Sequence, residues 1–179
     1  VAESNLSYID GDAGKLGYLG YSIGDLAREA SYEEVVYLLW HGRLPDAEEL
    51  ESFCTWTAGT RSLDDEILTE IRQLAAADEI PMAALRTIVS ALSAYDEDAD
   101  HEDVTDLDAN LRKACRITAK IPTALAAFER FRNGQEPVAP REDLSHAANF
   151  LYMLSTTRSP TRCWRRRSTW RSCFTPTTG

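Results

Sequence analysis

Apolar residues recur at helical spacing along most of this chain, and turn residues divide them into separate segments. A helix is predicted through Val35–His41, because Ser31–Glu34 has the sequence of a capping box and Gly42 can end the apolar run. Pro81 suits the first turn of a helix over Met82–Leu92. The other predicted helices begin near Asp46 and near Ser62, where the cap signal recurs, and extend over 106–132 and 144–154.

The remaining segments break this helical pattern. Tyr8–Tyr18 has two short strand-like runs around a Gly/Asp turn and predicts a β-hairpin within residues 6–20. We expect the helix over 106–132 to kink at Ile121–Pro122 and to end at Asn133–Gly134. The segment Asp96–Asp103 is expected to be a solvated acidic loop. Six or seven helices, one hairpin and no βαβ alternation place the chain in the mainly α class.

The acidic composition narrows the classes of function. With 29 Asp and Glu against 19 Lys and Arg, the chain has a formal charge of -10. Nucleic acids and anionic membranes require a positive surface, so neither is expected as a partner. No run of 18 apolar residues is present, which excludes a predicted transmembrane helix. Only three Lys accompany 16 Arg, and this composition favours a protein that works in high salt over an ordinary acidic soluble protein.

The cysteines and the N-terminal sequence indicate a reduced, cytoplasmic protein. Cys54, Cys115, Cys163 and Cys173 form no CxxC pair, so neither a disulfide framework nor a zinc site is expected. The first residues have neither the basic nor the apolar region of a secretory signal. The chain also begins without methionine, and we expect its N-terminus to be clipped.

The residues by themselves reveal no catalytic site. His41, His101 and His146 are scattered, and His41 is explained by a favourable position in the last turn of a helix. No phosphate-binding loop, nucleophile elbow or zinc-protease motif is present. The residues alone therefore predict a helical protein in which no catalytic, cofactor-binding or metal-binding residue can be named.

One acidic run has the spacing of a calcium loop. Asp96, Asp98 and Asp100 occupy the first, third and fifth positions of such a loop. However, His101 stands where glycine is needed and Leu107 where a bidentate glutamate is needed. Calcium binding is therefore not predicted.

Five segments follow one another across nearly all of residues 6–155: Tyr8–Ala27, Ser31–Pro45, Ile80–Leu92, Asn110–Gly134 and Asp143–Ser155. In this order and spacing they resemble citrate synthase. Two departures are local: Gly17–Tyr21 lacks an Arg that the family usually has there, and Ile80 stands where many members have His before Pro-Met.

The resemblance implies a mostly helical homodimer that condenses acetyl-CoA with oxaloacetate and water, giving citrate and CoA in the tricarboxylic acid cycle. Family members use two His and one Asp to manage a reactive enol, and all three follow the segment that ends here at Ser155. Residues 1–155 would then be the N-terminal part of the large helical domain. No catalytic residue can be carried over, and we expect the chain itself to be inactive.

Two other functions remain open. The first is 2-methylcitrate synthase, which performs the same chemistry with propionyl-CoA; the residues that would discriminate lie in the missing acyl pocket. The second is a non-catalytic helical interaction protein, in which a basic C-terminal tail binds an acidic surface. The chain would then fold autonomously, whereas a fragment of an enzyme would expose an apolar face and aggregate.

The last 24 residues differ sharply from the rest. Residues 1–155 carry a formal charge of -16, whereas Thr156–Gly179 contains six Arg and no acidic residue. In the frame that joins the third base of one codon to the first two of the next, Cys163–Trp164 encodes Leu and Phe174–Thr175 encodes His or Tyr. That frame permits PDPVLEEALDVALMLHPDHG, which resembles the next helix of citrate synthase. The hypothesis is an out-of-frame, non-native tail; a genuine basic tail is the alternative.

Overall fold

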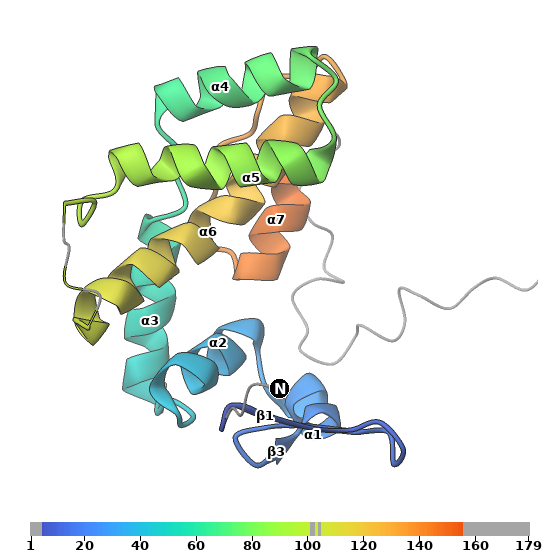
Figure 1. The fold of residues 1–179 in the computed structure, drawn as a ribbon, viewed down its shortest axis with the longest axis vertical. Helices are drawn as coiled ribbons and strands as arrows, with labels where there is room; N and C mark the ends of the chain where they lie inside the picture. The colour runs from blue at the N-terminus through green and yellow to red at the C-terminus, as the bar shows by residue number, and fades with distance from the viewer. Residues whose placement is uncertain (1–4, 101–102, 104, 156–179) are drawn as a thin grey trace, which may run out of the picture. The chain divides into compact units, whose positions relative to one another are not determined.

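The structure, a computed structural model, describes residues 5–100, 103 and 105–155, and these form two compact units (Figure 1). One unit comprises residues 5–54 and the other residues 55–155. In the described part of the chain there are seven α-helices, one short 3-10 helix and a three-stranded antiparallel sheet. The mainly α class predicted from the sequence is confirmed.

A β-meander begins the first unit. The predicted hairpin is present, with Ile9 opposite Leu16, and a third short strand pairs Tyr21 with Tyr18. The turn after the first strand is held by the Asp10 carboxylate, which accepts a hydrogen bond of 2.9 Å from the Ala13 amide. The strands, in sheet order, are β1 (Ser7–Asp10), β2 (Lys15–Tyr18) and β3 (Tyr21–Ser22).

Capping boxes set the helix starts in the first unit. Ser31 Oγ accepts from the Glu34 amide at 3.2 Å, and Glu34 Oε2 accepts from the Ser31 amide at 2.7 Å. Asp46 and Glu49 exchange the same pair of bonds at 2.9 and 3.0 Å, so both predicted caps are confirmed. The helices are α1 (Ile23–Glu29), which lies outside the predicted ranges, α2 (Tyr32–His41) and the first part of α3 (Ala47–Gly59).

Helices packed around one long helix form the second unit. Ile71, Ile88 and Phe128 come from three different helices and are at most 2% exposed, so they form the centre of the core. Helices α4, α5 and α7 each pack against α6. The elements of this unit after α3 are α4 (Asp65–Ala76), α5 (Pro81–Leu92), η1 (Ser93–Tyr95), α6 (Leu107–Arg132) and α7 (His146–Leu154).

Most predicted boundaries in this unit are confirmed. Pro81 is the first residue of α5, and α6 ends at Asn133 and Gly134, the latter with φ of 67°. The prediction that Ser62 caps α4 is wrong, because Asp64 is the residue before the first helical turn. Helix α6 continues through Pro122 as one helix, and the kink expected there stays a prediction.

Arg61 holds the segment that leads into α7 in place through hydrogen bonds. Its side chain is 3% exposed, and Nη1 donates hydrogen bonds of 2.8 Å to the carbonyl oxygens of Arg141 and Leu144. Asn149, in α7, accepts a further bond of 2.8 Å from the Arg141 amide. Partly buried backbone groups between α6 and α7 are thereby hydrogen-bonded without regular secondary structure.

Ion pairs bind the acidic segment after η1 to α6. The prediction that this segment is a solvated loop is wrong for Asp96 and Asp98. Arg116 donates to Asp96 through Nε at 2.8 Å and Nη2 at 2.7 Å. Asp98 accepts from Arg112 at 3.1 and 2.8 Å and from Arg116 Nη2 at 2.5 Å. The side chains of Asp96 and Asp98 are only 14% and 16% exposed. The two arginines are four residues apart on α6, so both guanidinium groups reach the same turn of the loop. We call residues 96–100 and their two arginines the ion-paired loop.

The same contacts lower the pKa values of both carboxyl groups. Hydrogen bonds from Arg112, and then from Arg116, hold the pKa of Asp98 well below its ordinary value. Hydrogen bonds from Arg116 likewise lower the pKa of Asp96, against the opposing effect of burial. Both groups are therefore ionised in the folded protein at neutral pH.

We predict that Asp98→Asn lowers the melting temperature at pH 7 and that this deficit narrows below about pH 4. The folded pKa of Asp98 lies below the value of about 3.9 for an unfolded aspartate. Its pairs therefore stabilise the fold above that pH, and this stability is lost as the pH falls through the folded pKa. Asp100→Asn, at an exposed position in the same loop, is the control. An Asp98→Asn deficit that is constant from pH 7 to pH 3 would contradict the prediction.

Candidate functional site

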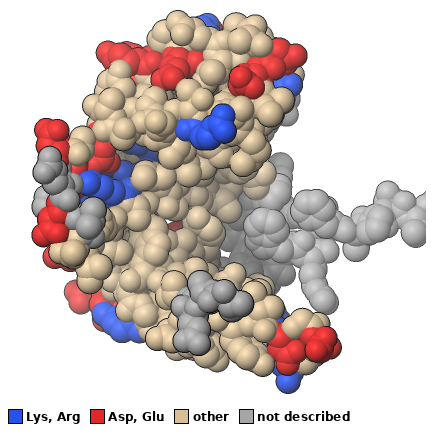
Figure 2. Space-filling view, viewed as in Figure 1, with Lys and Arg blue, Asp and Glu red and all other residues tan. Residues whose placement is uncertain are grey.

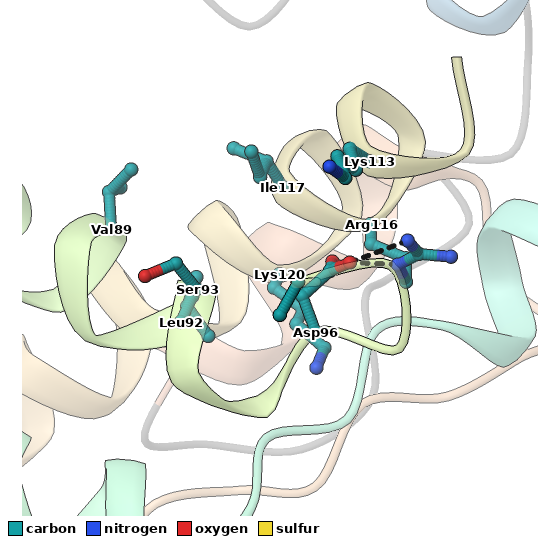
Figure 3. A pocket seen from close by; sticks show the side chains of 9 residues that line it. Val89, Leu92, Ser93, Asp96, Lys113, Arg116, Ile117 and Lys120 are labelled. Carbon is teal, nitrogen blue, oxygen red and sulfur yellow. Dashed lines mark hydrogen bonds and ion pairs between the residues drawn. The ribbon is translucent and has the colours of Figure 1, made fainter. Parts of the chain in front are cut away.

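A pocket of about 140 Å³ lies in the second unit, between α5 with η1 and the first half of α6 (Figure 3). Its lining residues recur at intervals of three and four along each helix, so each wall is one helix face. The first wall carries Val89, Leu92 and Ser93, the loop after it carries Asp96 and Ala99, and the second wall carries Lys113, Arg116, Ile117 and Lys120.

The lining combines positive charge with apolar surface. It contains three cations and a single carboxylate, although the chain as a whole carries a formal charge of -10. Two of the chain's only three lysines, Lys113 and Lys120, line this pocket. In the space-filling view, acidic side chains gather over α4, whereas basic side chains gather lower, between α5 and α6 (Figure 2). The pocket is therefore a local reversal of the chain's acidic character.

Arg116 is fixed in the wall by the ion-paired loop. Its side chain is 11% exposed, and its hydrogen bonds to Asp96 and then Asp98 raise the pKa of the guanidinium above its ordinary value. Lys120 is held less tightly, because its Nζ lies 3.7 Å from Asp64 Oδ2 and that carboxylate is half exposed. The wall thus has one rigid cation, and a second whose ion pair with Asp64 is long.

The side chains that line the pocket are suited to binding a ligand and not to catalysing a reaction. Asp96 is the only lining carboxylate, and its lowered pKa makes it a weak base. The Ser93 hydroxyl donates a hydrogen bond of 2.7 Å to the carbonyl of Ser90, so no base is arranged to activate it. The nine lining residues include no histidine or cysteine. The arrangement can neutralise an anion and cover an apolar group.

Two of the three histidines lie among the described residues, one in each unit. His41 is the last residue of α2, and its ring stacks on Tyr37 with centroids 4.1 Å apart, consistent with the structural role expected for it. His146 is the first residue of α7, in the other unit. His101 lies outside the described residues.

Calcium and zinc chemistry finds no support in the described residues. Asp96 and Asp98 bind arginines instead of projecting together toward a cation, and no cluster of three or more His, Cys, Asp or Glu side chains suited to a metal is found there. Cys54 and Cys115 are free thiols, and the other two cysteines lie outside the described residues. None of the described helices is long and apolar enough to cross a membrane.

The pocket is not among the features predicted from the sequence. The available signal was the spacing of Lys113, Arg116, Ile117 and Lys120, which places three cations and an apolar residue on one face of the predicted long helix. The opposite wall gave no comparable signal, because Val89 and Leu92 read as ordinary core residues of their helix.

Comparison with known proteins identifies the family. The sequence model of the family described as "Citrate synthase, C-terminal domain" matches residues 1–168. A citrate synthase from Haloferax volcanii is 66% identical over 155 residues, which are 87% of this chain and 41% of that protein. Citrate synthase 2 from Bacillus subtilis is 46% identical over 140 residues, which are 78% of this chain and 37% of that protein.

The fold agrees with the sequence comparison. The crystal structure of citrate synthase from Pyrobaculum aerophilum superposes with a TM-score of 0.84 at 40% sequence identity, covering 92% of this chain and 42% of that one. The chain thus spans about two fifths of the length of these two curated relatives. On both sequence and structure, the chain belongs to the citrate synthase family.

Proposed function

We propose that this chain is part of a citrate synthase, an acyltransferase that condenses acetyl-CoA with oxaloacetate and water to give citrate and CoA. The observation that carries the proposal is the 66% identity over 155 residues with a protein named citrate synthase. The activity belongs to the whole enzyme, because this chain spans 41% of that relative.

The residues that perform the chemistry are proposed to lie outside this chain. Enolising an acetyl group requires a base beside the methyl carbon and acids that stabilise the enolate and polarise the oxaloacetate carbonyl. Among the described residues, His41 and His146 lie in different units, and the pocket on α6 has no suitable base. The chain therefore supplies scaffold, and no catalytic residue is assigned to it.

We predict that the 179-residue chain releases no CoA above background when it is incubated with acetyl-CoA and oxaloacetate. Without a positioned base, the enolisation barrier is not lowered. A thiol-release assay measures this, with the Haloferax volcanii relative as the positive control. Turnover by this chain alone would contradict the assignment of the catalytic residues to the missing part.

The substrate preference requires the complete enzyme. 2-Methylcitrate synthase stays the alternative, since propionyl-CoA differs from acetyl-CoA by one methylene group. A hydrophobic pocket discriminates such a difference by about 1–3 kcal/mol, or roughly 10- to 200-fold in kcat/KM. Assaying the full-length enzyme with acetyl-CoA and with propionyl-CoA decides between the two activities. A preference for propionyl-CoA would overturn the citrate synthase proposal.

The basic segment Thr156–Gly179 is proposed to be an out-of-frame reading of the helix that should follow residue 155. The shifted frame restores both the acidic character of the preceding chain and a family-like helix ending in HPDHG. We predict that resequencing the gene from independent isolates reveals a shift of the reading frame near codon 156. The cause would be either an error in the present sequence or a real frameshift in the gene. An unbroken frame that encodes the arginine-rich segment in every isolate would refute the proposal.

The complete protein is proposed to be a cytoplasmic homodimer adapted to high salt, and this chain to be an incomplete part of it. Ile80 and Met82 lie at the start of α5 with 65% and 73% of their surfaces exposed, as expected for side chains that the rest of an enzyme covers.

We therefore predict that this chain elutes as aggregates in gel filtration, both with and without Thr156–Gly179. Exposed apolar side chains such as Ile80 and Met82 drive association when their normal partner is missing. A soluble monomer that acquires a partner only when the basic segment is present would instead support the non-catalytic interaction protein. The relative from Haloferax volcanii, in the same buffer, is the control for salt effects.

A further inference from the structure

We propose that Arg61 and Arg130 are positioning residues of the enzyme, because they fix the two ends of α7 and so the direction in which the chain continues beyond Ser155. This inference rests on the proposed function, which assigns the catalytic residues to the part of the enzyme after this point. Neither arginine is assigned a part in the chemistry itself, and both act through the orientation of α7.

A buried arginine holds the start of α7 from outside the helix. Arg61 lies between α3 and α4, and its side chain is 3% exposed. Its Nη1 donates to the carbonyl oxygens of Arg141 and Leu144, both at 2.8 Å, and Leu144 directly precedes the cap residue Ser145. A planar guanidinium group that donates to two carbonyl groups has a defined orientation, so it also fixes the backbone that enters the helix.

An arginine on α6 holds the end of α7. Arg130 donates through Nε to the Glu136 carbonyl at 2.6 Å and through Nη1 to the Ser155 carbonyl at 3.4 Å. The first bond fixes the guanidinium group beside the turn after α6, and the second, longer bond joins it to the residue after the last turn of α7. Helices α6 and α7 also pack side by side (Figure 1). Both ends of α7 are therefore attached to the second unit by arginine side chains.

A buried amide within α7 fixes the rotation of the helix about its own axis. Asn149 is 2% exposed, and its Oδ1 accepts a hydrogen bond of 2.8 Å from the Arg141 amide. The Arg141 guanidinium lies over the Tyr152 ring, 5.5 Å from its centroid, and Met153 is completely buried. Rotation of α7 would break the bond to Asn149 and expose Met153. The two arginines therefore act on the ends of a helix whose rotation is already constrained.

The direction of α7 is important because the proposed catalytic part follows its end. The shifted reading frame encodes a further helix after Ser155, and its first histidine overlaps the codons of Phe174 and Thr175. A helix of roughly 15 residues is about 22 Å long, so a rotation of about 5° at its start moves its far end by about 2 Å. A misplacement of about 1 Å at a reacting group lowers a rate on the order of 100-fold. Small changes at the ends of α7 should therefore lower turnover.

The full-length enzyme tests this inference, because it contains the part that covers the exposed apolar side chains of this chain. Arg130→Met removes both hydrogen bonds at a partly exposed position, and Arg61→Lys keeps the charge but replaces the planar guanidinium group. Arg132→Met is the matched control on the same helix, because the ion pairs of Arg132 are with the side chains of Asp78 and Glu129.

Turnover per folded molecule separates positioning from stability. Thiol release measures kcat and KM with acetyl-CoA and oxaloacetate, and circular dichroism at the assay temperature gives the folded fraction by which kcat is corrected. We expect Arg130→Met and Arg61→Lys to lower the corrected kcat about tenfold and to change KM less than about twofold. We expect Arg132→Met to change neither quantity. A purely structural role would lower the folded fraction and leave the corrected kcat unchanged.

The possible outcomes distinguish this inference from the proposed function. A wild-type enzyme without turnover on these substrates overturns the proposed function and this inference with it. If the wild type is active, the positioning role alone is overturned when either folded variant keeps its corrected kcat within about twofold of the wild type. Equal losses in Arg130→Met and Arg132→Met also overturn it. If Arg61→Lys does not fold, the comparison of Arg130→Met with Arg132→Met decides.

Discussion

Close packing against helix α6 is the constraint on which the second unit depends. Its buried face is built largely from small residues, with Ala119, Ala124 and Ala127 at most 2% exposed. Alanine lets the backbones of neighbouring helices approach closely, and Phe128 then fills the space between α4 and α5. The small buried residues of α6 therefore let its neighbours in this unit pack closely against it.

The pocket follows from the same helix. The first half of α6 lines the pocket with Lys113, Arg116 and Lys120, whereas Ala124 and Ala127 in its second half belong to the core cluster. Long charged side chains hold their heads away from an apolar neighbour and leave space between the helices. The ion-paired loop closes this end, since Asp96 takes up the charge of Arg116 that would otherwise be poorly solvated. The core and the pocket thus use different residues of the same helix.

The sequence predicted what is local. The capping boxes at Ser31 and Asp46 and the glycine ends at Gly42 and Gly134 fix helix boundaries through contacts within four residues, so their signals are readable without tertiary structure. Ser62 failed as a cap because Asp64, two residues later, is where the chain turns helical. The pairs of Asp96 with Arg116 and of Asp98 with Arg112 join residues 20 and 14 positions apart, and no local pattern specifies such pairs.

The sequence contains no nameable catalytic residue, and this is compatible with the family assignment because the chain spans only 41% of its relative. Family membership rests on scaffold segments that pack, cap and turn, and these dominate the 155 residues matched to the Haloferax volcanii relative. Catalytic groups are few and need only be brought together by that scaffold. A chain that spans 41% of its relative can therefore carry a specific family signature in its helices while its chemistry is proposed to reside elsewhere.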